Sequence, residues 1–161
     1  MSGSRLTAVL FMASLAVACG PRVDVATAVE VTDVTTGWYD AGVVSGHNKL
    51  VPSVGFRLRN VSNVSLRNLQ LNAVFQRVGD TEKWGDSYRQ RALAGNGLAP
   101  GASTDPLVLR SNVGYTSEVP RSTMLDHSQF KDARVELFAR YGSAQYTKIG
   151  EWPIERVMLA R

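Results

Sequence analysis

Few side chains in this sequence are suited to chemistry. The 161 residues include two histidines, His47 and His127, and one cysteine, Cys19. Two histidines are too few for a multi-histidine zinc site without carboxylate ligands, and the chain has no HExxH, CxxC or Gly-x-Ser-x-Gly motif. Asp126, His127 and Ser128 are consecutive, whereas the members of a catalytic triad come from separate segments. The sequence therefore predicts no catalytic residue, no metal site and no cofactor, and we expect a protein that is not an enzyme.

The single cysteine lies at the end of an export signal. Arg5 gives the N-terminus a positive charge, and residues 6–18 form an apolar run of 13 residues. That run is shorter than the roughly 20 residues that a membrane-spanning helix needs. Small residues close the run just before Cys19, as they do before the cleavage site of a secretory signal. The pattern predicts export of the mature chain.

Residues 16–19, Ala-Val-Ala-Cys, resemble the lipobox at which bacterial lipoprotein signals are cleaved. The resemblance implies cleavage before Cys19, a diacylglyceryl thioether on its sulfur and an acyl chain such as palmitate on its new amino group. Residues 1–18 would be the lipoprotein signal peptide, 19–22 the lipidated N-terminus with a short tether, and 23–161 the folded domain. Several acyl chains anchor a protein stably in a membrane. The alternative is an ordinary cleaved signal with a cysteine nearby by chance.

The lipobox resemblance implies a place in the bacterial cell envelope, at the periplasmic face of a membrane. In enterobacterial lipoproteins an aspartate after the lipidated cysteine retains the protein in the inner membrane. This chain has Gly20 there, so the outer membrane is favoured over the inner. The formal net charge of +4 is too small and too dispersed to indicate nucleic acid binding. We therefore expect the membrane and an envelope protein as partners, and no nucleic acid.

Residues 53–79 are the best-patterned stretch and predict the centre of an all-β domain. Apolar and polar residues alternate there with a period of two, which is typical of strands that bury one face. The side chains predicted to enter the core are Val54, Phe56, Leu58, Leu69, Leu71, Ala73 and Phe75. Between the two runs, the polar residues 60–65 predict a turn whose side chains bond nearby backbone groups.

The rest of the chain predicts further short strands. These fall within residues 23–36, 87–92, 104–110, 133–140 and 145–154, with a break at 37–40 and turns at 45–48, 79–80 and 98–102. Residues 111–131 are the least regular stretch, in which Pro120 could open a short helix over 121–128. About seven short strands with frequent turns indicate one immunoglobulin-like β-sandwich domain.

The order of these elements is similar to that of FxLYD-type immunoglobulin-like modules, which occur in many bacterial envelope lipoproteins. The matching segments cover about a third of the chain and are residues 55–60, 69–75, 79–80 and 98–101. The resemblance implies a fold and a non-catalytic habit, and it assigns no functional residue.

Aromatic residues beside predicted turns are the binding candidates, because aromatics are enriched where interfaces concentrate their energy. Tyr115, Trp38 and Trp84 are the principal ones, and Tyr115 leads because it lies in the irregular stretch. The alternative is that these rings pack in the core. We expect a membrane-anchored protein-binding or assembly module with a flat site. The other possibility is a sensor of a small ligand or glycan, with a concave pocket under the 111–131 loop.

The lipid anchor gives a direct prediction. Cys19→Ser removes the sulfur that would carry the diacylglyceryl group, so the protein should leave the membrane fraction and appear in the soluble fraction. Membrane fractionation with immunoblotting measures this change. A variant that is cleaved normally and stays in the membrane would contradict the lipoprotein assignment.

Overall fold

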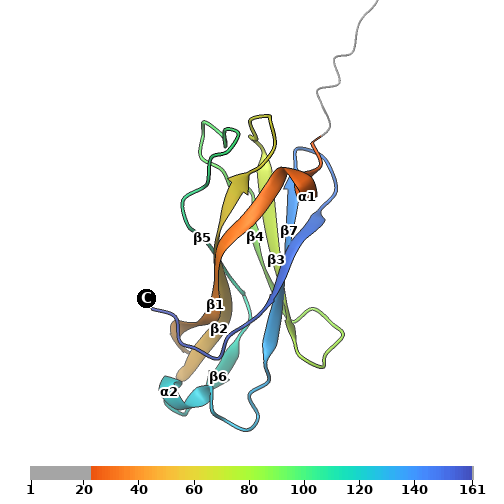
Figure 1. Cartoon of the computed structure of the whole chain (residues 1–161). Coiled ribbons are helices and arrows are strands. Elements are labelled where there is room, and N and C mark those ends of the chain that lie inside the picture. The colour runs from red at the N-terminus through yellow and green to blue at the C-terminus, as the bar shows by residue number, and fades with distance from the viewer. Residues whose placement is uncertain (1–22, 161) are drawn as a thin grey trace, which may run out of the picture.

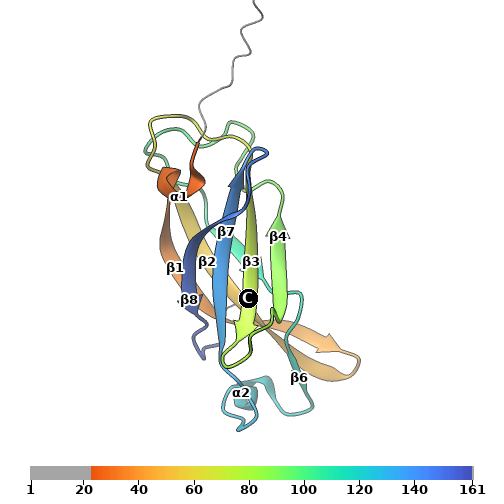
Figure 2. The ribbon, with the colours of Figure 1, turned by 90° about the vertical axis from the view of Figure 1, so that its right-hand side faces the viewer.

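A computed structural model describes residues 23–160, which form two antiparallel β-sheets packed face to face (Figures 1 and 2). One sheet has the order β1 (Val29–Val44), β2 (His47–Asn60), β5 (Leu107–Arg110), and β6 (Tyr115–Ser117) also pairs with β2. The other sheet has the order β4 (Gly85–Arg89), β3 (Leu69–Arg77), β7 (Ala133–Tyr141), β8 (Thr147–Pro153). Two short helices, α1 (Val25–Ala28) and α2 (Arg121–Met124), complete the described chain. The predicted all-β, immunoglobulin-like β-sandwich is confirmed.

The predicted core residues face each other between the two sheets. All seven of them, from Val54 to Phe75, are at most 2% exposed. Val135 and Leu137 of β7 meet them from the same sheet as β3 and are fully buried. Burial of each such large apolar side chain contributes about 1.5–3 kcal/mol. The period-two pattern of residues 53–79 therefore reflects the alternation of buried and less buried side chains along the two strands.

The two best-patterned strands lie in different sheets, because residues 61–68 cross from β2 to β3. The buried side chain of Asn60 organises this crossing. Its Nδ2 donates hydrogen bonds to the carbonyls of Val64 and Leu98, each at 2.8 Å. Its Oδ1 accepts hydrogen bonds from the backbone N–H and the hydroxyl of Ser62, at 3.0 and 2.7 Å. The polar turn residues thus bond nearby backbone groups, as their composition predicted.

The expected break at residues 37–40 is wrong, because β1 continues through them to Val44. A segment near the C-terminus runs beside β1 there, and Gly37 makes room for it. A methyl group on Gly37 would lie 2.8 Å from the Leu159 side chain and 2.9 Å from the Val157 carbonyl. The Trp38 N–H donates to the Val157 carbonyl at 2.8 Å, and the Leu159 N–H donates to the Trp38 carbonyl at 2.9 Å. Gly37 therefore serves a close contact within a strand.

The predicted turn between β1 and β2 is confirmed. Ser45 and Gly46 both have positive φ, 51° and 82°, as a two-residue type I′ hairpin requires. This hairpin projects beyond the body of the sandwich (Figure 2). Val43 and Val44 on it are 62% and 44% exposed. We call residues 43–47 the hairpin tip.

Element boundaries differ from prediction at several places. The Pro100-Gly101 turn is confirmed by a φ of 75° at Gly101, but the β4 edge strand begins at Gly85, before the predicted 87–92. The helix after Pro120 ends at Met124 instead of reaching 128. The next N–H groups, of Asp126 and His127, bond to carbonyls three residues back, which tightens the chain into turns and ends the α-helix. The described residues contain no helix long and apolar enough to cross a membrane.

The two ends of the sandwich have different contents. At one end lie α1 and the loops 61–68, 90–106 and 142–146, and we call it the N-terminal end. At the other lie the hairpin tip, α2 and the loops around it, and we call it the far end. Figure 1 shows the two ends separated by the full length of the strands.

The Asn60 hydrogen bonds predict a large effect on stability. Asn60→Ala removes the two hydrogen bonds that Asn60 donates and the two that it accepts at a buried position, so the free energy of unfolding should fall by about 2–4 kcal/mol. Chemical denaturation measures the fall. Asn63→Ala is the matched control, because Asn63 is exposed in the same loop, and it should change stability by less than about 0.5 kcal/mol. Equal effects of the two substitutions would contradict this account.

Candidate functional site

The irregular stretch after β5 is ordered by its contact with β2. Tyr115 of β6 pairs with Leu50 of β2, and Gly114 lets the two backbones approach closely. A methyl group on Gly114 would lie 2.0 Å from the Leu50 carbonyl oxygen, which no side chain tolerates. The strand β6 was not predicted, since its pairing depends on this contact between distant segments.

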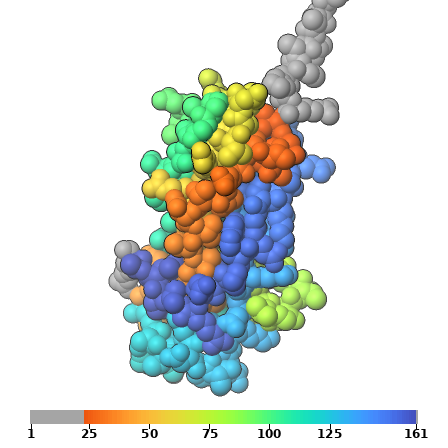
Figure 3. Space-filling view, in the orientation of Figure 1, coloured from red at the N-terminus to blue at the C-terminus, as the bar shows by residue number. Residues whose placement is uncertain are grey.

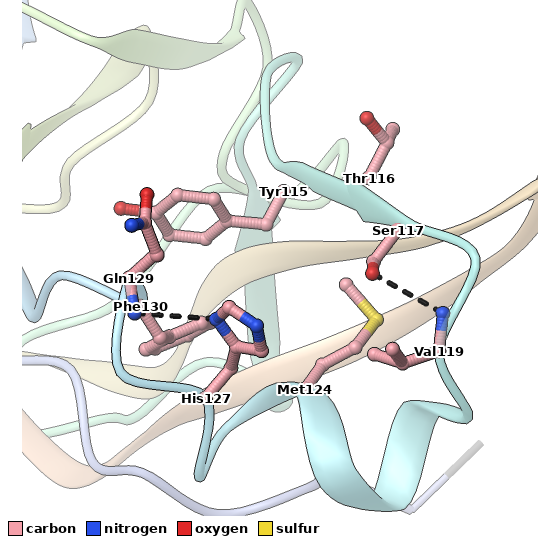
Figure 4. Close-up of a pocket in the computed structure, with 8 residues that line it drawn as sticks. All are labelled: Tyr115, Thr116, Ser117, Val119, Met124, His127, Gln129 and Phe130. Atoms are coloured by element: carbon pink, nitrogen blue, oxygen red, sulfur yellow. Dashed lines mark hydrogen bonds between the residues drawn. The ribbon is translucent and has the colours of Figure 1, made fainter.

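Under this stretch lies a pocket of about 320 Å³ (Figure 4). Tyr115, Phe130, Met124 and Val119 supply apolar surface. The polar groups belong to Thr116, Ser117, His127 and Gln129. A concave pocket with converging polar groups is the feature that we associated with a ligand sensor, and the site is not the flat patch expected of a protein-binding module.

Four rings from four segments meet behind and beside this pocket. We call Trp38, Trp84, Tyr115 and Phe130 the aromatic cluster. The Phe130 ring centroid lies 4.6 Å from that of Trp38 and 4.6 Å from that of Tyr115. The Trp84 and Tyr115 centroids are 4.9 Å apart. These spacings are those of favourable aromatic pairs, each worth about 0.5–1.5 kcal/mol beyond burial. The structure therefore brings the three sequence candidates together.

The three candidates differ in their access to a ligand. Trp38 is fully buried, so its ring supports the cluster from within the core and cannot touch a ligand. Its place beside a predicted break was misleading, because β1 does not break there. Trp84 and Tyr115 are half-buried, and Tyr115 lines the pocket.

Phe130 and Met124 are pocket residues that sequence reasoning missed. Both are buried, at 7% and 2% exposure. Phe130 is a single large apolar residue in the polar run 126–132, which was the one signal available.

Contacts with β1 and β2 hold residues 118–121 of the 111–131 loop in place. Arg121 Nε lies 2.7 Å from Asp40 Oδ1 and fixes α2 to β1. The Asn48 side chain donates to the Val119 carbonyl at 2.9 Å. His47 Nε2 lies 3.5 Å from the Glu118 carboxylate and connects the hairpin tip to the loop.

Arg156 holds the other side of the loop. Its guanidinium donates to the carbonyls of Leu125 and Phe130, both at 3.1 Å, and lies 5.3 Å from the Phe130 ring centroid. The hydrogen bond with Asp132 raises the pKa of Arg156 above its already high ordinary value. The guanidinium therefore remains charged throughout the ordinary pH range, and its hydrogen bonds to the Leu125 and Phe130 carbonyls do not depend on its titration.

The pocket's histidine is arranged to offer a hydrogen bond. His127 Nδ1 accepts the Gln129 N–H at 3.2 Å (Figure 4), so the proton of the neutral ring resides on Nε2. His127 and Ser117 both line the pocket, but within residues 23–160 no hydrogen bond joins them. No group of three or more His, Cys, Asp or Glu in that part of the chain could hold a metal ion. The side chains that line the pocket can make hydrogen bonds and apolar contacts with a bound group.

Comparison with known proteins adds little to this description. No family model matches the chain, and no curated protein matches it. The X-ray structure of Northeast Structural Genomics Consortium target SoR45 is 10% identical over 81% of this chain and 89% of that chain, with a TM-score of 0.45. The ligand binding region of Serine-glutamate repeat protein A of Enterococcus faecium is 13% identical over 73% of this chain and 89% of that chain, with a TM-score of 0.31. The chain is thus defined by its own geometry, as an immunoglobulin-like sandwich with a pocket at its far end. Cys19 lies outside the described residues.

The Tyr115 hydroxyl gives a prediction for this site. It accepts the Lys131 N–H and donates to the Lys131 carbonyl, both at 3.3 Å, which closes the loop across the pocket. Tyr115→Phe should lower the free energy of unfolding by about 0.5–1.5 kcal/mol and speed amide hydrogen exchange at Lys131. Tyr39→Phe is the control, since the Tyr39 ring stacks under Arg110 at 3.6 Å and a phenyl ring keeps that contact. Slow exchange at Lys131 in the Tyr115 variant would contradict the role of the hydroxyl.

Proposed function

We propose that the protein is an exported, lipid-anchored, non-enzymatic binding module of the bacterial envelope, and that it captures a partner protein with its far end. Cys19 supplies the anchor, and the pocket beneath the 111–131 loop receives an apolar side chain of the partner. The immunoglobulin-like sandwich serves as the rigid support between anchor and pocket.

The observation that carries this proposal is the exposed hairpin tip beside the pocket. Val43 and Val44 are exposed there, and the His47–Glu118 contact joins the tip to the loop. Asn48 of β2 pairs with Ser117, a pocket residue. The hairpin tip therefore carries exposed apolar side chains near the pocket, where a partner larger than a small molecule could contact both.

The size of the pocket is compatible with a side chain as its occupant. Its volume of about 320 Å³ is at the small end of the roughly 300–1,000 Å³ of small-molecule sites. Protein interfaces concentrate their energy in such places, where one large side chain of the partner fills a well-packed hollow. Tyr115 and Phe130 would provide the walls.

The position of the pocket suits an anchored protein. The described chain begins at the N-terminal end, and α2 and β6, which border the pocket, lie at the other end (Figure 1). β1 has 16 residues, and a strand of that length spans roughly 50 Å at about 3.3 Å per residue. A lipid at Cys19 would leave the pocket facing away from the membrane, where a partner can reach it.

A second candidate function is the sensing of a free small ligand or glycan. The polar lining favours it, because His127 Nε2–H, the Gln129 amide and two hydroxyls can fix the orientation of a small polar molecule. Thermal stability measured with a panel of sugars would reveal it. A ligand that raises the melting temperature, and fails to do so in His127→Ala, would favour this candidate over the first.

Site-directed photo-crosslinking in cells tests the protein partner. A photoreactive amino acid placed at Thr116 or Gln129, both exposed at the pocket, should give one reproducible crosslinked envelope protein, identified by mass spectrometry. The same group at Asn96, exposed at the N-terminal end, is the matched control and should not capture that protein. Capture of the same proteins from all three positions, or of none from the pocket positions, would overturn the proposal.

A further inference from the structure

The N-terminal end of the sandwich has a second hollow with a different lining. Loops 61–68 and 90–97 border a hollow of about 470 Å³, to which Arg67, Asn68, Gln90 and Arg91 contribute. Arginine and amide side chains present hydrogen-bond donors, and two of these four carry a positive charge. The hollow is therefore suited to an anionic group.

Three arginines at this end have no carboxylate partner in the described part of the chain. Arg67, Arg89 and Arg91 are exposed, and no ion pair joins any of them to a carboxylate within residues 23–160. The loops 61–68, 90–106 and 142–146 contain one acidic residue, the exposed Asp105. Arginines of the far end, by contrast, are paired, as Arg121 is with Asp40. Unpaired guanidinium groups bind phosphate readily, because two N–H donors match two phosphate oxygens.

Two exposed acidic side chains also lie at this end, Asp105 in the loop before β5 and Asp24 beside α1. Asp24 caps α1 by accepting the Ala26 N–H at 3.1 Å. Val61 lies next to the last residue of α1, since its N–H donates to the Ala28 carbonyl at 3.0 Å. The Val61 side chain is 51% exposed. The end therefore combines positive charge with an exposed apolar residue.

The position of the predicted lipid anchor indicates that a membrane would cover this surface. Residue 23 enters the fold at this end, beside the loops that carry the arginines (Figure 3). Cys19 precedes it by four residues, which span at most about 14 Å when fully extended. A lipidated Cys19 would therefore hold the N-terminal end of the sandwich, which carries the arginines, next to the lipid headgroups.

We propose that the N-terminal end binds the headgroup phosphates of anionic phospholipids, with Arg67, Arg89 and Arg91 as the contacts. This inference rests on the anchor in the proposed function. Each basic residue near an anionic membrane surface raises the affinity by about fivefold. Contact through three arginines would hold the N-terminal end against the bilayer and orient the long axis of the sandwich away from the membrane. The pocket would then point away from the membrane at a fixed height.

The test uses the full chain, purified from membranes in detergent and reconstituted into vesicles. One set of vesicles is phosphatidylcholine, and the other also contains phosphatidylglycerol. A fluorophore at Ser65→Cys reports the distance of loop 61–68 from an acceptor on the headgroups, and one at Ser128→Cys reports the far end. Both positions are exposed. We expect energy transfer from the Ser65 position to rise on phosphatidylglycerol vesicles, while transfer from Ser128 stays low on both.

The charge-removal variant is Arg67→Gln/Arg89→Gln/Arg91→Gln, which should lose more than half of that rise. The control variant removes equal charge from the middle and far end of the sandwich, as Lys49→Gln/Lys83→Gln/Lys131→Gln, and should keep the rise. A rise that survives in the arginine variant, or that both variants lose equally, would overturn the proposal.

Vesicle flotation separates this inference from the anchor on which it rests. Anchored protein floats with both kinds of vesicle, and the transfer measurement then decides the inference. Protein that floats only with phosphatidylglycerol vesicles would overturn the anchor and support binding by the arginines. Protein that floats with neither kind would overturn both.

Discussion

The structure depends on the hydrogen bonding of β2 along both of its edges. β1 pairs with one edge over nearly its whole length, while β5 and β6 share the other. The inner side chains of the β5-paired portion, Val54 and Phe56, are core residues. The β6-paired portion seats the irregular stretch by way of Gly114. A single strand thus passes from the centre of the core to the edge of the pocket, so the position of the site is fixed by the same backbone that fixes the fold.

The aromatic cluster belongs to the core and to the site at once. Trp38 is fully buried and Phe130 is nearly so, whereas Trp84 and Tyr115 are half-buried. Tyr115 and Phe130 line the pocket, and the buried Trp38 packs against both of them. If the pocket binds a partner as proposed, such support would keep its surface in shape beforehand and reduce the entropy lost on binding. Substitutions in the cluster would then affect stability and the proposed binding together.

Local patterns in the sequence predicted the sandwich but only part of the site. The core residues from Val54 to Phe75 were found because strand burial leaves a period-two record in consecutive residues. Trp84 was predicted as a binding residue because it stands beside a turn, and Tyr115 because it lies in the irregular stretch. Both remain predictions, and their convergence with Phe130 depends on distant segments. Gly37 was predicted to break the strand. A glycine that leaves room for a neighbouring segment, here the one with Val157 and Leu159, cannot be distinguished in the sequence from a glycine that ends a strand. The anchor at Cys19 remains a prediction.

The segment that crosses β1 has a consequence for the order of folding. The Thr36 hydroxyl accepts the Glu155 N–H at a sequence separation of 119 residues, and the neighbouring Arg156 fastens the loop over the pocket. Contacts across such a separation form slowly, because a long loop must close before they stabilise anything. The sheets can assemble first from nearer partners, such as the β1–β2 and β7–β8 hairpins. The pocket is therefore among the last parts of the molecule to take shape, and a chain still in the course of folding would have no site to offer.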